Sequence, residues 1–225
     1  HIPRDEGIET MAYYFETRSD KSVSTKSLCD LANIILKENY FELNRKTYHQ
    51  KLGTAIGTKF SPPYANLFMA GLEKRLFENT VYNPYLWLRY LDDIFCIWTQ
   101  GNNKLHEFFE YLNNFHPTIK FTMENSTEKI NFLDVQVTKN NEKLETDLYC
   151  KETDRHQYLH AKSCHRHIYK KSIPFGQAIR LKRIVSDESR LNERLNELHS
   201  WIVNRGYKSE DVKKEIDRAR TPNRE

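Results

Sequence analysis

The stretch that decides the fold is Trp87-Leu88-Arg89-Tyr90-Leu91-Asp92-Asp93-Ile94-Phe95-Cys96-Ile97-Trp98. Apolar and aromatic residues flank Asp92 and Asp93 on both sides, which is typical of two β-strands joined by a tight turn. Adjacent carboxylates repel one another, so a cation that neutralises them stabilises the pair. Mg²⁺ is the expected ion, because it takes carboxylate oxygens together with the phosphates of a substrate. A solvated turn without a metal is the alternative.

Composition narrows the class of protein. The chain has 225 residues, of which 38% are hydrophobic, enough for one large domain or two small ones. It contains no apolar run long enough for a membrane span, so we expect no membrane partner. The four cysteines are widely spaced and predict reduced thiols in an intracellular protein. Because the chain starts at His1, we expect a fragment of a longer protein.

Charge is unevenly distributed along the chain. Residues 1–149 carry 17 Lys/Arg and 20 Asp/Glu, whereas residues 150–225 carry 18 Lys/Arg and 11 Asp/Glu. A neutral or acidic part followed by a basic part is typical of an enzyme that acts on nucleic acid. A solvated helical surface explains the same bias.

The remaining pattern predicts an α+β fold with an antiparallel sheet backed by helices. Helices are expected at 22–38, from Pro62 or Pro63 onward, and at 104–115. An extended segment at 40–52 leads into a loop rich in Gly and Pro, and strands are expected at 118–123, 131–138 and 143–150. The pattern after residue 150 is helical, so we predict domains at 1–150 and 151–225.

Two motifs together carry a resemblance to a known family. Gly57-x-x-x-Ser61-Pro62 before a helix, followed by Tyr90-Leu91-Asp92-Asp93 in a hairpin, resembles reverse transcriptases. Further strings are similar to the Penelope-like retroelements among them: Gln50-Lys51-Leu52-Gly53-Thr54-Ala55-Ile56-Gly57, Ala65-Asn66-Leu67-Phe68-Met69, His116-Pro117-Thr118-Ile119-Lys120-Phe121-Thr122, Phe132-Leu133-Asp134-Val135, and Arg155-His156-Gln157-Tyr158-Leu159-His160 through Ser163-Cys164-His165.

The resemblance implies a polymerase palm followed by a basic helical thumb. Its reaction would be RNA-directed DNA synthesis, in which deoxynucleoside triphosphates extend a DNA primer on an RNA template. Asp92 and Asp93 would hold two Mg²⁺ ions, with Mn²⁺ as an alternative, and Lys120 would protonate the pyrophosphate. The resemblance also implies action in the nucleus and assigns substrate or template binding to Gln50, Gly53, Gly57, Ser61, Tyr90, Arg180 and Arg183.

The chain departs from the family pattern in one respect that affects catalysis. The family carries a third metal-binding aspartate shortly before a string similar to Ile2-Pro3-Arg4-Asp5, and here the sequence begins at that string. We therefore expect the fingers to be absent and the isolated chain to be inactive. Asp5 is interpreted as an acid at the start of a helix. A non-catalytic nucleic-acid-binding module, derived from a domesticated or decayed retroelement, is the alternative function.

Several residues keep a structural alternative beside the functional one. Gly53 and Gly57 also suit a turn into the helix, and Ser61 also suits an N-cap. Lys120 fits a solvent-facing position in a strand. Residues 132–135 resemble a primer grip but also fit an edge strand, and Arg89 and Lys59 suit either phosphate contacts or surface charges.

The cysteines and histidines after residue 149 also leave two interpretations open. Thiolates and imidazoles at such spacings are possible zinc ligands. A basic loop that faces nucleic acid is the alternative, because no C-x-x-C pair is present and the histidines are mixed with Lys, Arg and Tyr. The cluster comprises Cys150, His156, His160, Cys164, His165 and His167.

Overall fold

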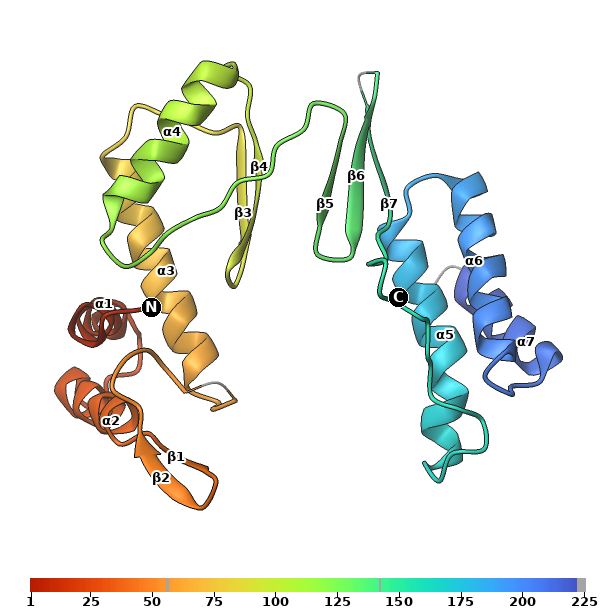
Figure 1. Ribbon diagram of the computed structural model, residues 1–225, viewed down its shortest axis with the longest axis horizontal. Coiled ribbons are helices and arrows are strands. Elements are labelled where there is room, and N and C mark those ends of the chain that lie inside the picture. Colours follow the sequence, from red (N-terminus) through yellow and green to blue (C-terminus); the bar gives the residue numbers. More distant parts are fainter. Residues whose placement is uncertain (56, 142, 222–225) are drawn as a thin grey trace. The chain divides into compact units, whose positions relative to one another are not determined.

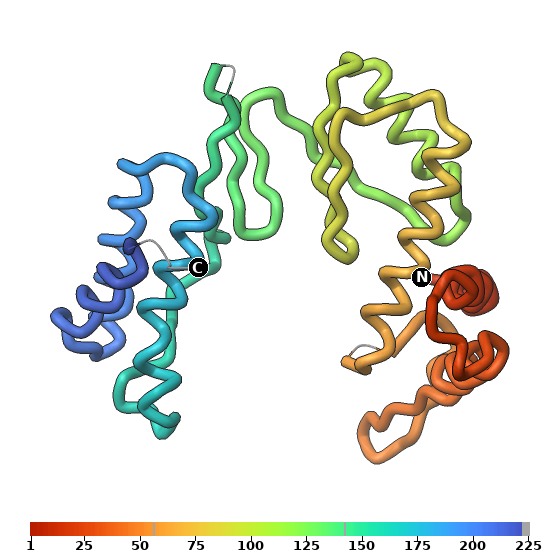
Figure 2. Tube along the Cα trace, turned by 180° about the vertical axis from the view of Figure 1, so that it is seen from behind, coloured from red at the N-terminus to blue at the C-terminus, as the bar shows by residue number. Residues whose placement is uncertain are grey.

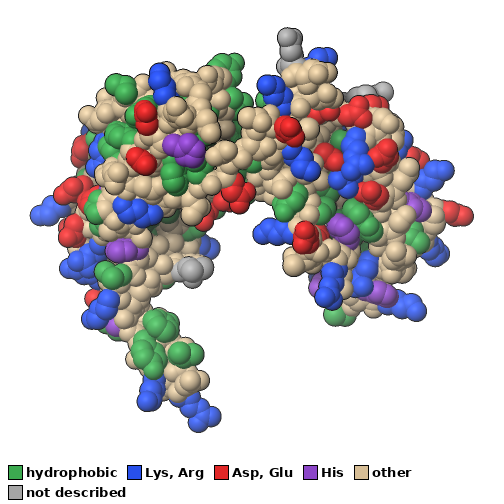
Figure 3. Space-filling view, turned by 45° about the horizontal axis from the view of Figure 1, so that its top comes forward, with side chains coloured by type: hydrophobic (Ala, Val, Ile, Leu, Met, Phe, Trp, Pro, Cys, Tyr) green, Lys and Arg blue, Asp and Glu red, His purple; other side chains and the backbone are tan. Residues whose placement is uncertain are grey.

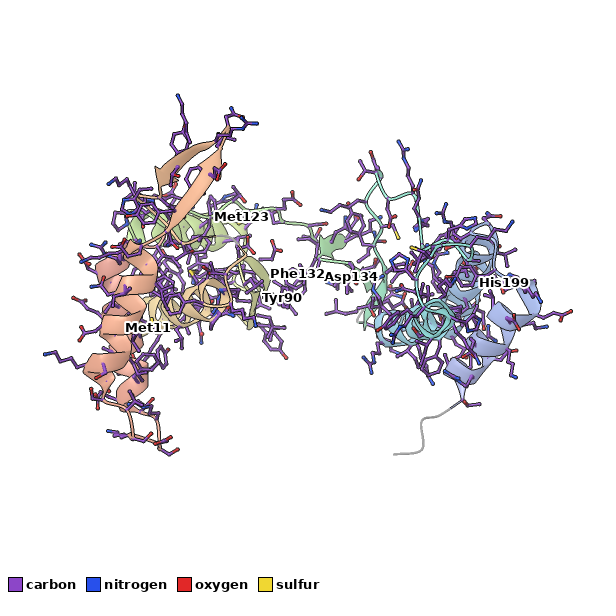
Figure 4. The ribbon with its side chains drawn as sticks, turned by 90° about the horizontal axis from the view of Figure 1, so that it is seen from below. Met11, Tyr90, Met123, Phe132, Asp134 and His199 are labelled. Atoms are coloured by element: carbon purple, nitrogen blue, oxygen red, sulfur yellow. The ribbon has the colours of Figure 1, made fainter. Side chains whose placement is uncertain are left out.

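A computed structural model describes residues 1–55, 57–141 and 143–221 and divides the chain into two compact units, His1–Met123 and Glu124–Glu225. Figure 4 labels Met123, the last residue of the first unit. The division lies earlier than the predicted boundary at 150, because strand residues before 150 bond to the helices of the second unit. The structure combines helices with small antiparallel sheets, which is compatible with an α+β class (Figure 1).

The first unit contains four helices and two β-hairpins among its described residues. In chain order these are α1 (Arg4–Glu16), α2 (Thr25–Lys37), β1 (Tyr40–Leu43), β2 (Lys46–His49), α3 (Ser61–Glu78), β3 (Leu86–Tyr90), β4 (Asp93–Ile97) and α4 (Asn102–Phe115). The two hairpins stay separate in the described part of the chain, so the continuous sheet expected for a palm is not formed there.

Two apolar clusters hold this unit together. One lies between α1, α2 and α3 and is centred on Met11, Leu36 and Tyr64. In the other, Phe108 of α4 packs against Trp98 with ring centroids 5.2 Å apart, and Trp87 lies 6.0 Å away. This second cluster fastens hairpin β3–β4 to α3 and α4, whereas β1 and β2 are exposed along their whole length.

The strand predicted at 118–123 was wrong. Two side chains near the end of α4 take the hydrogen bonds that a neighbouring strand would otherwise provide. The Asn113 amide bonds both the N–H and the C=O of Phe121, and His116 Nδ1 accepts from the N–H groups of Thr118 and Ile119. The backbone therefore stays irregular.

The second unit begins with a three-stranded antiparallel sheet, β5 (Lys129–Phe132), β6 (Val135–Asn140) and β7 (Lys143–Leu148). The single strand predicted at 131–138 is instead a hairpin, because the chain turns at Leu133 and Asp134, and Leu133 adopts a positive φ of 54°. From β7 a long loop leads into the helices, and Figure 2 shows it running beside the first of them.

The helices of this unit are α5 (His167–Ile184), α6 (Glu188–Val203) and α7 (Ser209–Arg220). They pack around one core, in which Leu198, Ile202 and Val212 are almost completely buried. Leu148 at the end of β7 belongs to the same core, so the sheet is anchored to the helices by its last strand. Among the described residues, no helix of either unit combines the length and apolarity needed to cross a membrane.

Asp147 of β7 makes the strongest polar contact between this sheet and α6. Its carboxylate accepts hydrogen bonds from Arg190 Nε at 2.8 Å and from Arg194 Nε and Nη2 at 2.9 Å. Burial opposes ionisation of Asp147, but the bonds from Arg194, Arg190 and the Leu148 N–H outweigh it and lower its pKa to about 2.

The second unit is therefore expected to lose stability in acid. A carboxyl group whose pKa is lower in the folded state stabilises the fold above its ordinary pKa of 3.8, and this contribution disappears as the pH falls toward about 2. The contribution is about 2 kcal/mol. Urea unfolding between pH 5 and pH 2 should show a steeper loss for the native sequence than for Asp147→Asn.

Asp217→Asn provides the control, because Asp217 is exposed on α7 and has no partner among the described residues. Its pH profile should match that of the native protein. Equal acid sensitivity of Asp147→Asn and the native protein would contradict the assignment.

Candidate acidic turn and nucleic-acid interface

The acidic pair lies at the end of a regular two-stranded hairpin, as the flanking residues predicted. Tyr90 of β3 faces Asp93 of β4, and Leu91 and Asp92 form the turn between them. Leu91 adopts a positive φ of 56°, a conformation that is unusual for a branched side chain. Its side chain and that of Tyr90, which Figure 4 labels, are exposed, so the turn presents apolar as well as acidic groups to solvent.

A partly buried polar network supports this turn. Glu73 of α3 accepts from Arg89 Nε at 2.8 Å and from Trp87 Nε1 at 2.9 Å through the same carboxylate oxygen. Arg89 Nη1 also donates to the side chain of Asn66 and to the carbonyl of Leu91, each at 3.0 Å. Arg89 is thus not a solvated surface charge, since its guanidinium bonds the turn to α3.

The carboxylates of Asp92 and Asp93 are exposed and have no hydrogen-bond or ion-pair partner among the described residues. Exposed oxygens on a supported turn suit a hard cation such as Mg²⁺, which keeps water and phosphate oxygens in its other positions. Within the described ranges, no third Asp, Glu, His or Cys side chain lies near enough to complete a three-ligand group with them.

The residues expected to bind template or nucleotide lie in an irregular segment before α3. Gly53 and Gly57 have φ values of 76° and 92°, so the backbone there uses a conformation that glycine adopts without strain. A side chain at Gly57 would meet no other atom within 4 Å, which leaves this backbone open to a ligand. Ile56, part of the same string, lies outside the described residues.

Two polar side chains of this segment bond to the segment itself. Gln50 Nε2 donates to the carbonyl of Leu52 at 2.9 Å. Ser61 Oγ donates to the carbonyl of Ala55 at 2.6 Å and also contacts Thr58 Oγ1. Ser61 is the first residue of α3 and Phe60 occupies the N-cap position, so the N-cap prediction for Ser61 was wrong. Its hydroxyl instead joins the first turn of α3 to the preceding loop through the bonds to Ala55 and Thr58.

Lys120 has a structural role that neither prediction anticipated. Its ammonium donates to the carbonyls of Asn113 and His116, the latter at 3.2 Å, where α4 ends. A cation at a helix C-terminus satisfies carbonyls that lack partners within the helix and interacts favourably with the helix dipole. Because no strand forms at 118–123, Lys120 is not a strand residue.

In the second unit, Arg180 forms an ion pair with Asp134, whereas Arg183 is exposed. Arg180 Nε donates to Asp134 Oδ2 at 2.9 Å, which links α5 to the β5–β6 turn. Asp134, which Figure 4 labels, belongs to the string that resembles a primer grip, and that string forms a turn and not an edge strand. Arg183 faces solvent on the last turn of α5.

A concentration of exposed positive charge lies where the loop from β7 enters α5. Residues 151–171 contain six Lys or Arg and two acids, together with four histidines. Lys170 bonds to the carbonyls of Ala161 and Ser163, and the other five basic side chains are exposed. Figure 3 shows blue Lys/Arg and purple His side chains gathered at one end of this unit. We call residues 151–171 the basic segment.

The structure brings together part of the predicted Cys/His cluster. Cys150, Asp154 and His156 offer ligand atoms that all lie within 4.8 Å of one another. His160 Nδ1 accepts from the N–H of Lys162 instead, and Cys164 is exposed. Asp154 was missed from the sequence, although its Asp-x-His spacing with His156 was a usable signal.

Comparison with known proteins adds one finding. Residues 157–217, less than half of the chain, match the family model of an animal helix-turn-helix domain. No curated protein and no solved structure matches the chain. The matched range covers α5 and α6 entirely and most of α7, and the α6–α7 turn contains Gly206 with a φ of 84°. Helix-turn-helix domains that bind DNA place one helix in its major groove.

Loss of Glu73 should destabilise the first unit strongly. Glu73→Met leaves the guanidinium of Arg89, with a side chain 11% exposed, without its anionic partner. Removing one member of such a pair costs about 3 kcal/mol. Glu78→Met is the control, because Glu78 pairs with Lys74 at 3.9 Å and both side chains are more than half exposed. Its cost should stay below about 1 kcal/mol. Equal costs in chemical denaturation would contradict the proposed support of the turn.

Proposed function

We propose that residues 157–217 form a nucleic-acid-binding module in which the basic segment contacts the phosphate backbone. The observation that carries this proposal is the helix-turn-helix match over three helices that pack around one core. This is the function expected of a non-catalytic module, and the match supports it more directly than it supports polymerase chemistry.

Charge favours the beginning of α5 as the contact surface. Arg166 and Lys171 are exposed beside the first turn of an 18-residue helix, whose N-terminal N–H groups also attract phosphate. The first turn of α7 instead carries the acids Glu210 and Asp211, which repel phosphate. Tyr169, 61% exposed next to these cations, supplies a ring on which an unpaired base can stack.

Removal of two basic side chains should weaken binding in a salt-dependent way. In Arg166→Gln/Lys171→Gln, each lost phosphate contact lowers the slope of log K against log[salt] by about one. The double variant should therefore bind duplex with a slope smaller by about two and should lose affinity equally for unrelated sequences. Fluorescence anisotropy at several salt concentrations measures both quantities.

Lys26→Gln/Lys104→Gln removes the same charge from exposed positions in the first unit and serves as the control. Its affinity and salt slope should remain close to those of the native chain. Equal losses of affinity in the two double variants would show that only the net charge of the chain matters. That result would overturn the proposed interface.

The exposed acidic turn favours a second proposal, that of a reverse transcriptase fragment. In this proposal Asp92 and Asp93 are catalytic and metal-binding residues, and the substrates are an RNA template, a DNA primer and deoxynucleoside triphosphates. Bound Mg²⁺ would neutralise charge on the attacking and leaving oxygens of nucleotidyl transfer. The network of Glu73 and Arg89 keeps the turn in one geometry, which is the positioning that such chemistry requires. Gly57 leaves open backbone before α3 for a nucleotide or template.

Metal binding at the turn can be tested separately from catalysis. Mn²⁺ should broaden the amide signals of residues 90–94 in the native chain, because a paramagnetic ion relaxes nearby nuclei, but not in Asp92→Asn/Asp93→Asn. Glu107→Gln/Glu110→Gln, on α4, should leave the broadening unchanged.

Primer extension on an RNA template with Mg²⁺ then tests the reaction, and we expect no synthesis by the 225-residue chain. Synthesis that Asp92→Asn abolishes would show a complete catalytic centre, and unbroadened signals would exclude metal from the turn.

A further inference from the structure

We infer that Cys150, Asp154 and His156 form a site for a divalent transition metal such as Zn²⁺, separate from any role of the acidic turn. The three residues follow β7 within a short stretch, and their ligand atoms lie within 4.8 Å of one another. Zn²⁺ binds Cys sulfur at about 2.3 Å and His nitrogen or carboxylate oxygen at about 2.0–2.2 Å, so ligand atoms around it stand about 3.5 Å apart. His156 Nδ1 and Asp154 Oδ2 already have this separation, 3.5 Å.

The backbone between the ligands is folded by its own hydrogen bonds. The N–H of Asp154 donates to the carbonyl of Lys151 at 2.8 Å, and the N–H of His156 donates to Asp154 Oδ1 at 2.8 Å. Because Oδ1 takes this bond, Oδ2 remains available as a ligand. His156 adopts a positive φ of 48°, and its Nδ1 faces Asp154 Oδ2.

Contacts with α6 hold the histidine ring in place. The ring of His156 stacks on Trp201 with centroids 3.5 Å apart and an interplanar angle of 15°. Stacking covers the face of the imidazole and leaves Nδ1 on its edge, where it meets Asp154. The following residues are also fastened, since Arg205 Nε donates to the carbonyl of Tyr158 at 2.8 Å. Asp154 and His156 therefore already stand at a suitable separation, and the sulfur of Cys150 lies within 4.8 Å of both ligand atoms.

An open side remains for entry of the ion and for a fourth ligand. Cys150 and Asp154 line a cavity of about 290 Å³, and the side chain of Asp154 is 46% exposed. Three protein ligands leave one tetrahedral position for water. The bound ion would join the end of β7 to the loop that stacks on α6, so it would tie the start of the basic segment to the helical core.

Cobalt provides the test, because Co²⁺ takes tetrahedral zinc sites and a bound thiolate gives it an intense charge-transfer absorption. The full chain, stripped with a chelator and kept reduced, is titrated with Co²⁺ and then with Zn²⁺. We expect one equivalent of Co²⁺ to produce the thiolate band and Zn²⁺ to remove it. Absence of the band in the native chain would overturn the proposal.

Matched variants locate the site. Cys150→Ser should abolish the band, whereas Cys164→Ser, at an exposed cysteine outside the triad, should keep it. Asp154→Asn should lower the affinity for Co²⁺ at least tenfold. Circular dichroism confirms that each variant retains its helices. A band that survives Cys150→Ser, that disappears in Cys164→Ser, or that is unaffected by Asp154→Asn would overturn the assignment of these three ligands.

Discussion

Hairpin β3–β4 and the β5–β7 sheet depend on one constraint, which is that a short antiparallel sheet is at best marginally stable in water unless its apolar face is covered. Hairpin β3–β4 has only two strands, and it is held by the aromatic contacts of Trp87 and Trp98 with Phe108. The β5–β7 sheet meets the same requirement through Leu148, which enters the helical core, and Asp147, which bonds to two arginines of α6. The positions of the acidic turn and of the loop that follows β7 depend on these attachments.

Contacts within each unit also involve several of the cationic side chains that the sequence predicted to bind a substrate. Arg89 fastens the acidic turn, Lys120 ends α4, and Arg180 holds the β5–β6 turn. Each of these side chains was a candidate for phosphate or pyrophosphate, and each has carboxylate, amide or carbonyl partners inside its own unit. The exposed cations of residues 151–171 and the exposed carboxylates of Asp92 and Asp93 are therefore the stronger candidates for ligand contacts.

These two surfaces point to nucleic acid in different ways. The helix-turn-helix match supports binding by the second unit, and it covers residues 157–217. The acidic turn supports a polymerase only through its geometry and its resemblance to a family motif. A protein with both properties would bind a polynucleotide by its basic segment and position a metal at its turn, and the two sets of variants separate these contributions.

The sequence by itself determined the features that depend on neighbouring residues. It predicted the hairpin around Asp92, helices at 22–38, from Pro62 or Pro63 onward and at 104–115, and the helical pattern after residue 150, because alternation, helical spacing and turn residues act locally. The structure has those three helices at Thr25–Lys37, Ser61–Glu78 and Asn102–Phe115. Only the tertiary structure decided which side chains already have hydrogen-bonding or stacking partners within the protein. Glu73 supports Arg89 from another element, Asn113 and His116 replace a strand partner for residues 118–121, and Trp201 orients His156 from α6. Glu73 and Trp201 act on residues in other elements, and the bonds of Asn113 and His116 depend on side-chain geometry, so hydrophobic periodicity encodes none of these contacts.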